Sequence, residues 1–245
     1  MLSASLIAVL HCAGMGGLAK AQSANAPDGK ARAAAVAAPN VAANLATARP
    51  ANPDASPAVT ALLQYLKRLP EQPDGRVLAG QNIGHANEDL VAAYAKYFTG
   101  LRKATGQVPA VLGIDYGYSQ LPPKGMARAN QLLIQHWLEG GLVTASMSPG
   151  NPWTGGALRD RSTGSADTKD LVTPGTEAYK RWHAQLDHVA EALAQLRDAG
   201  VVVLWRPLHE MNGDFFWWSA GKDRGWAQPQ EFRALWRDLF DYLTR

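Results

Sequence analysis

The residues of this sequence best suited to chemistry are concentrated between Trp205 and Trp218. This segment holds an imidazole, His209, and an acid, Glu210, followed by an amide, a glycine and four aromatic rings. A carboxyl group between bulky rings is well placed for a raised pKa, which a general acid needs. Flat aromatic surfaces beside polar groups suit a sugar ring, which has apolar faces and a rim of hydroxyls. The segment therefore predicts an acid-bearing site for a carbohydrate.

The element that must position this segment is the apolar, β-branched run at 201–204, which predicts a fully buried strand. Buried strands of α/β proteins carry their sites on the loops that follow their carboxyl ends. Glu210 lies on such a loop. A structural alternative is that Glu210 only forms a buried ion pair with Arg206, among rings that merely fill a core.

The segment 205–218 resembles the acid/base motif of glycoside hydrolase family 26, which reads R-P-x-H-E-M-N-G-x-x-F/W-W-W. The best-known members of that family are endo-β-mannanases. The resemblance implies that Glu210 is the catalytic acid/base at the end of the fourth strand of a (β/α)8 barrel, with His209 beside it and Arg206 orienting the carboxylates. It extends in layout over roughly residues 60–245.

Other residues are candidates for substrate binding. Asp115 follows a predicted strand, where an acid holds a loop or binds sugar hydroxyls, and His85 could line the groove or anchor its loop. Trp153 could stack on a sugar or pack as a lid. Trp217 and Trp218 are adjacent and cannot face the same way in an extended segment. We expect Trp218 to contact the sugar.

The third predicted loop departs from the family pattern. Family members often read W-H-P-x-N-P, with the histidine contributing to substrate binding, whereas this chain has Ser148 at the histidine position. A serine cannot carry the same charge or span the same reach. This departure leaves hydrolysis of mixed-linkage β-glucan or β-1,3-xylan open beside that of mannan.

The rest of the chain predicts four strand–loop–helix units in succession. Because such alternation with short connections produces a parallel sheet, the fold class is α/β, and we expect a (β/α)8 TIM barrel truncated after about four β/α units. No Gly-x-Gly-x-x-Gly follows the first strand, so a dinucleotide fold lacks support. The predicted strands are 76–81, 110–115, 142–146 and 201–206, and the predicted helices are 59–68, 88–105, 125–139, 177–199 and 229–244.

The first 57 residues differ in composition from the rest. Residues 1–22 resemble a secretory signal without its usual positive start, and residues 23–57 are Ala- and Pro-rich and predict a disordered linker. Residues 58–245 are then a partial family 26 catalytic barrel. We expect a secreted or periplasmic protein, without a stable membrane span.

Composition and charge bound the function further. The chain has 245 residues with a net charge of +3, and its Lys and Arg residues are scattered, so we expect no nucleic-acid partner. No element carries metal-ligand spacing, and we predict neither a metal nor a cofactor.

The predicted function is hydrolysis of β-1,4-mannan by retaining double displacement, which needs two carboxyl groups about 5–5.5 Å apart. In the family the nucleophile is a Glu on strand seven, so we expect the nucleophile to be absent from this chain and the chain alone to be inactive. A non-catalytic carbohydrate-binding relic of the same fold is the alternative.

Overall fold

The computed structural model describes most of the chain beyond the first 48 residues. The described ranges are 49–71, 77–84, 88–117, 123–162, 167–219 and 229–245. The predicted signal, most of the predicted linker and His85 lie outside these ranges. The helix predicted to follow the linker begins at Pro57, and Asn52 before it is already buried, so the folded part includes the last residues of the predicted linker.

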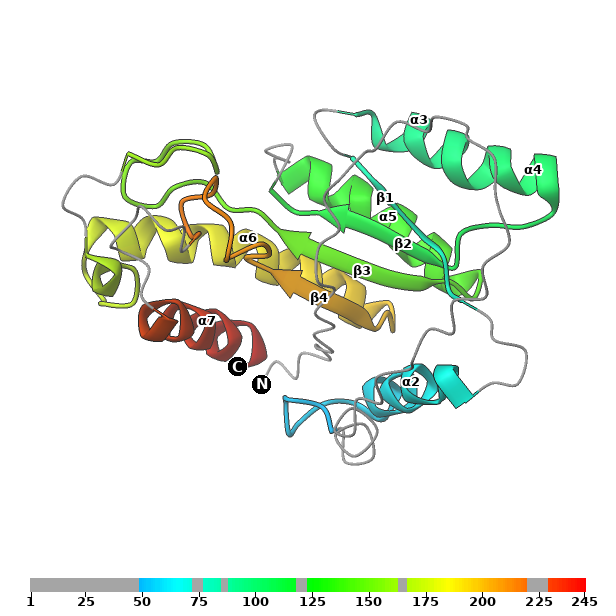
Figure 1. The fold of residues 1–245 in the computed structure, drawn as a ribbon, viewed down its shortest axis with the longest axis horizontal. Helices are drawn as coiled ribbons and strands as arrows, with labels where there is room; N and C mark the ends of the chain where they lie inside the picture. The colour runs from blue at the N-terminus through cyan, green and yellow to red at the C-terminus, as the bar shows by residue number, and fades with distance from the viewer. Residues whose placement is uncertain (1–48, 72–76, 85–87, 118–122, 163–166, 220–228) are drawn as a thin grey trace, which may run out of the picture.

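A four-stranded parallel sheet forms the centre of the molecule (Figure 1). Its strands are β1 (Gly80–Ile83), β2 (Val111–Asp115), β3 (Leu142–Met147) and β4 (Val203–Pro207), and they pair in chain order. Each strand returns to the sheet through a helical connection. This arrangement confirms the predicted α/β class and matches four successive units of a (β/α)8 barrel.

Helices follow each strand and cover the sheet (Figure 1). The helices are α2 (Pro57–Arg68), α3 (Leu90–Tyr94), α4 (Leu101–Thr105), α5 (Pro123–Leu138), α6 (Glu177–Asp198) and α7 (Pro229–Thr244). A π-helical stretch, η3 (Ala95–Gly100), joins α3 to α4, and two short 3-10 turns are η1 (Leu69–Glu71) and η4 (Thr168–Leu171). None of the helices in the described ranges is long and apolar enough to cross a bilayer.

The residue bounds predicted for the first strand were wrong. The expected strand was 76–81, but β1 is Gly80–Ile83, and Val77 is exposed. Pairing with β2 explains the difference. Asn82 lies opposite Gly113, and a Cβ atom on that glycine would come within 1.8 Å of the Asn82 side-chain oxygen. Asn82 therefore pairs with β2 because Gly113 leaves room for its side chain, and the apolar residues 77–79 before it lie outside the strand.

The main hydrophobic core lies between the sheet and its covering helices. Leu112 and Val143 are fully buried on the sheet, and Leu133, Trp182 and Leu186 are fully buried on α5 and α6. Burial of side chains of this size stabilises the fold by about 1.5–3 kcal/mol each. This layer holds the four parallel strands together, and their carboxyl ends lie along a common edge of the sheet.

A second, smaller core lies under the opposite end of the sheet. Val59 and Leu62 of α2 pack with Val202, next to the partly buried Leu142 and Leu204. Helix α2 therefore covers the amino-terminal ends of β3 and β4. Among the described residues, the carboxyl ends of the strands face the loops that carry the polar residues.

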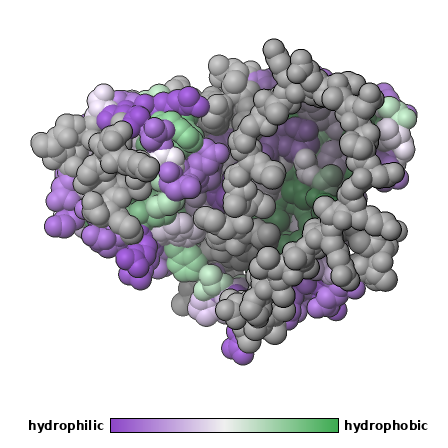
Figure 2. Space-filling model, in the orientation of Figure 1, coloured by the Kyte–Doolittle hydropathy of each residue, from purple (hydrophilic) through white to green (hydrophobic). Residues whose placement is uncertain are grey.

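The described part of the surface is mainly hydrophilic on the side shown in Figure 2, with smaller hydrophobic areas between.

Candidate active site

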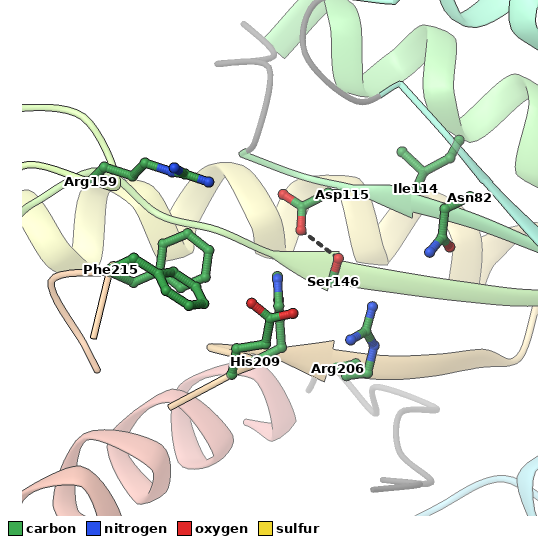
Figure 3. A pocket seen from close by; sticks show the side chains of 10 residues that line it. Asn82, Ile114, Asp115, Ser146, Arg159, Arg206, His209 and Phe215 are labelled. Atoms are coloured by element: carbon green, nitrogen blue, oxygen red, sulfur yellow. Dashed lines mark hydrogen bonds between the residues drawn. The ribbon is translucent and has the colours of Figure 1, made fainter. Parts of the chain in front are cut away.

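One row of the sheet places three polar side chains side by side at its carboxyl end. The parallel register aligns Asp115 of β2 with Ser146 of β3, and Ser146 with Arg206 of β4. Figure 3 shows all three in the same pocket, with Asn82 beside them. The row brings a carboxylate, a hydroxyl and a guanidinium within reach of one ligand.

The pocket above this row has a volume of about 360 Å³, within the range of small-ligand sites. Its walls come from all four strands and from the loops after β3 and β4. The lining residues are Asn82, Ile114, Asp115, Ser146, Arg159, Arg206, His209, Glu210, Phe215 and Phe216. Four of the sequence-predicted site residues, namely Asp115, Arg206, His209 and Glu210, therefore meet in one pocket.

The backbone of the β4 loop has an unusual conformation around His209. Leu208 and Glu210 have φ angles of 48° and 56°, and they are the only non-glycine residues with positive φ in the described chain. Such a conformation costs on the order of 1–2 kcal/mol for a residue with a Cβ. Strain of this kind persists where surrounding contacts impose it, and it clusters at functional sites.

Hydrogen bonds to the end of β3 and within the β4 loop itself hold this conformation. The backbone N–H of Leu208 donates to the carbonyl of Met147 at 3.1 Å. The indole N–H of Trp218 donates to the carbonyl of His209 at 2.8 Å, and the N–H of Gly213 closes a turn on the carbonyl of Glu210 at 2.9 Å. The carbonyls of both His209 and Glu210 thus accept hydrogen bonds from residues later in the same loop.

Glu210 itself is exposed and lines the pocket, and it forms no ion pair with another described residue. The structural alternative, an internal ion pair with Arg206, is therefore not what the described chain adopts. The carboxyl is also less enclosed by rings than the sequence suggested. Two phenylalanines, Phe215 and Phe216, supply the aromatic lining.

The placement of Trp218 corrects our expectation. Trp217 and Trp218 are both fully buried, so neither presents a face to the pocket. Trp218 stacks on Phe216, with ring centroids 4.3 Å apart, and its N–H holds the His209 carbonyl. The planes of the two indoles are nearly perpendicular, at 85°, and both rings lie inside the protein. Their role is to support the loop from below.

Trp153 also packs against the protein. Its ring meets that of Trp217 edge to face at 5.6 Å, and its N–H donates to the carbonyl of Asp167 at 3.3 Å. The half-buried indole is not part of the pocket lining. This geometry corresponds to the lid-packing alternative and not to a sugar platform. His85, the remaining candidate, lies outside the described residues.

The serine in place of the family's histidine is fully buried below the pocket. The hydroxyl of Ser148 donates to the carboxylate of Asp115 at 3.0 Å, and the hydroxyl of Ser146 donates to the same oxygen. Asp115 therefore ties β2 to β3 while it lines the pocket. Among the described residues, no three His, Cys, Asp or Glu side chains are grouped so that they could hold a metal ion.

Several lining residues were not predicted from the sequence. Ser146 and Asn82 each lie one residue before the carboxyl end of a strand, β3 and β1, and the rule that found Asp115 could have found them. Phe215 was passed over in favour of its tryptophan neighbours. Arg159 comes from the middle of the long β3–α6 loop, where no local pattern distinguishes it.

Comparison with known proteins gives consistent matches. The model of a family described as Glycosyl hydrolase family 26 matches residues 51–245. A mannan endo-1,4-beta-mannosidase of Bacillus subtilis is 32% identical over 208 residues, which are 81% of this chain and 56% of that protein. The mannan endo-1,4-beta-mannosidase A and B of Caldalkalibacillus mannanilyticus is 34% identical over 203 residues, 79% of this chain and 38% of the relative. The chain thus spans about half or less of these relatives.

Solved structures match as well. The Bacillus subtilis mannanase structure has a TM-score of 0.68 and 29% identity, with 81% of this chain and 61% of that chain covered. A family 26 structure from a Muricauda species has a TM-score of 0.62 and 33% identity, covering 78% of this chain and 59% of that one. The similarity extends beyond the β4 motif to the whole described fold.

Proposed function

This chain belongs to glycosyl hydrolase family 26, and from that premise we propose that it carries the acid/base side of the catalytic site of an endo-acting hydrolase of β-1,4-linked mannan. The observation that supports this most is the strained, doubly anchored loop that presents Glu210 to a 360 Å³ pocket. The relatives named above are mannan endo-1,4-beta-mannosidases, which supports mannan as the substrate.

The charges of the pocket fit a neutral sugar. Two carboxylates, Asp115 and Glu210, face two guanidiniums, those of Arg159 and Arg206. The formal charges of these four groups sum to zero, so they give the pocket no net charge that would favour an acidic or a basic ligand. Hydroxyl, guanidinium and carboxylate groups together can donate to and accept from the hydroxyls of a sugar.

In the proposed reaction, the carboxyl of Glu210 protonates the oxygen of the departing sugar and later takes a proton from the attacking water. His209 and Arg206 lie beside it in the pocket and orient carboxylates and substrate. Asp115 accepts hydrogen bonds from Ser146 and Ser148 and is a poor candidate for attack on the anomeric carbon. We therefore propose that the nucleophile comes from outside these 245 residues and that the chain alone is inactive.

Two measurements test the proposal. The purified chain should bind β-1,4-linked manno-oligosaccharides in calorimetry without releasing reducing ends from mannan. In an active protein that contains the chain, Glu210→Gln should slow hydrolysis of mannan by roughly 10²–10⁴-fold, the usual share of general acid catalysis. Glu191→Gln makes the same chemical change on the exposed face of α6 and should leave the rate unchanged.

Substrates with different leaving groups make the test specific for an acid. Activated aryl glycosides need little protonation, so Glu210→Gln should slow their first step much less than it slows mannan hydrolysis. Equal loss for both classes would reject the acid role. Binding of oligosaccharides with no effect of Glu210→Gln on any rate would instead favour the non-catalytic, carbohydrate-binding alternative.

We also propose that the protein acts outside the cytoplasm, where a polymeric mannan is accessible. The support is the apolar segment 1–22, which resembles a secretory signal. Mass spectrometry of protein recovered from the medium or periplasm of expressing cells would show a new N-terminus beyond this segment. Retention of the intact N-terminus in the cytoplasm would reject it.

A further inference from the structure

The pocket receives a guanidinium from a loop that the sequence analysis did not assign to the site. Arg159 lies in the long connection between β3 and α6, is exposed, and lines the pocket. Figure 3 shows it reaching over the ring of Phe215, on the opposite side of the pocket from Arg206 and Asn82. His209 lies between these two ends.

The backbone on both sides of Arg159 is fixed by hydrogen bonds. The carbonyl of Leu158 accepts from the backbone N–H of Trp217 at 3.2 Å, which ties this loop to the β4 loop. The carbonyl of Asp160 accepts from the side-chain amide of Asn151 at 2.7 Å, and the N–H of Asp160 donates to the carbonyl of Ala157 at 2.9 Å. The base of the arginine side chain is therefore held in place before a ligand arrives.

The neighbouring acid does not neutralise this arginine. The carboxylate of Asp160 accepts from the hydroxyl of Thr154 and from the backbone N–H of Ser162 at 2.9 Å, so it stabilises the loop. The guanidinium carbon of Arg159 lies 5.9 Å from the centroid of the Phe215 ring, within the range of a cation–π contact. Arg159 forms no salt bridge with a described carboxylate, and Figure 3 shows its guanidinium directed toward the pocket.

This combination suits the next sugar of a polysaccharide. A guanidinium presents five donors in a rigid fork and no acceptor, which matches neighbouring hydroxyl oxygens of one pyranose ring. Phe215 contributes an apolar surface below it. A polysaccharide that lies along the pocket from Arg206 past Glu210 would extend to Arg159. The sugar unit beside Arg159 would then lie beyond the glycosidic bond whose oxygen Glu210 protonates.

On the basis of the proposed function, we propose that Arg159 is a specificity-determining residue that binds the hydroxyls of this further sugar unit and sets the length of chain recognised. The site is distinct from the motif residues at Arg206, His209 and Glu210, because it is carried by a different loop. It makes no contribution to the binding of a disaccharide that occupies only the Arg206 end.

The test is calorimetric binding of manno-oligosaccharides of increasing length to the full chain and to Arg159→Leu. A hydrogen bond to a charged group contributes about 1.5–3 kcal/mol, so the longer oligosaccharides should lose about ten- to a hundredfold in affinity. The disaccharide should bind as before. Arg159→Lys keeps the charge without the fork and should restore only part of the loss.

The matched control is Arg128→Leu, which removes the same charge from the exposed face of α5, where Arg128 bonds Gln131. This variant should bind every oligosaccharide as the original chain does. Because Arg159 is exposed, its replacement should leave the unfolding temperature unchanged.

The outcomes separate the two proposals. Equal affinity of Arg159→Leu and the original chain for all lengths overturns the role of Arg159, and so does an equal loss for the disaccharide and the longer oligosaccharides. In both of these cases the original chain still binds, and the proposed function stands. If the original chain binds no manno-oligosaccharide, the proposed function fails and the inference fails with it.

Discussion

The hydroxyl of Ser148 donates a hydrogen bond to the carboxylate of Asp115 across 3.0 Å, and this bond joins the loop that follows β3 to the end of β2. Both residues are buried, and a second hydroxyl, that of Ser146, donates to the same oxygen. The acid that ends the second strand is thus a brace between strands, and the serine that departs from the family pattern is its partner.

Replacement of Asp115 should therefore destabilise the fold. Asp115→Ala leaves two buried hydroxyls without their acceptor, and each such loss costs about 1–3 kcal/mol. We expect the free energy of unfolding, measured in urea, to fall by about 2 kcal/mol or more. In the double variant Asp115→Ala/Ser148→Ala the loss should be smaller than the sum of the single losses, because the stranded hydroxyl is gone. Strict additivity would show that the two side chains do not interact.

Replacement of Glu210 by glycine should stabilise the fold, because the backbone conformation at this position is unfavourable for a residue with a Cβ atom. Its φ of 56° favours glycine, so Glu210→Gly should raise the free energy of unfolding by about 0.5–1 kcal/mol after the greater freedom of the unfolded chain is counted. Glu191→Gly, the same substitution within α6, should lower it by about 1 kcal/mol. Thermal unfolding of the two variants measures both, and a loss of stability in each would show that the Glu210 backbone is not strained.

Gly117 should tolerate no larger residue. A Cβ atom there would lie 2.3 Å from the carbonyl oxygen of Ser148, which is backbone and cannot rotate away. Gly155 has open space around it but a φ of 75°. Gly155→Ala should thus cost about 1–2 kcal/mol from backbone conformation alone, and Gly117→Ala should cost more. Chemical unfolding of the two variants gives the comparison, and equal losses would contradict the steric explanation.

The stability of the fold should fall at mildly acidic pH because of His136. Burial lowers the pKa of this imidazole below its ordinary value of 6.5, and the hydrogen bond to the Ala110 carbonyl and the charge of Glu139 oppose the shift. The unfolded chain therefore binds the proton more readily than the folded chain. The stabilisation is complete above pH 6.5 and is lost progressively as the pH falls from there toward the lowered pKa.

Urea unfolding at several pH values between about 5 and 8 measures this loss. His136→Gln should flatten the decline below the ordinary histidine pKa, even if its overall stability is lower. His188→Gln, on the exposed side of α6, should keep the decline. A profile unchanged by His136→Gln would assign the pH dependence to other groups.

Most of the fold could be predicted from the sequence because its signals are local. Helix α6 was expected at 177–199 and lies at Glu177–Asp198, since an N-cap threonine and a terminal glycine mark its ends. Strand β1 was misplaced because its register depends on Gly113 of another strand. A pairing of that kind leaves no trace in the strand's own residues.

The site could be predicted only in part for the same reason. Glu210, His209 and Arg206 lie on one contiguous motif, and Asp115 ends a recognisable strand, so all four were found. Which aromatic rings face the pocket depends on tertiary contacts. Trp218 turns inward to bond the His209 carbonyl, and Phe215 is left at the surface. No spacing rule in a turn distinguishes these two outcomes.

The β4 loop and the β3–α6 loop form the pocket rim, and the β3–α6 loop is joined to the β4 loop through its main-chain carbonyls. The indole N–H of Trp217 donates to the carbonyl of Pro149 at 2.8 Å, and its backbone N–H donates to that of Leu158. A carbonyl is present whatever the residue, so mutations along the β3–α6 loop can accumulate without undocking it. Evolution is therefore free to vary the side chains at this rim, and with them the preferred glycan, while the acid-bearing turn keeps its shape.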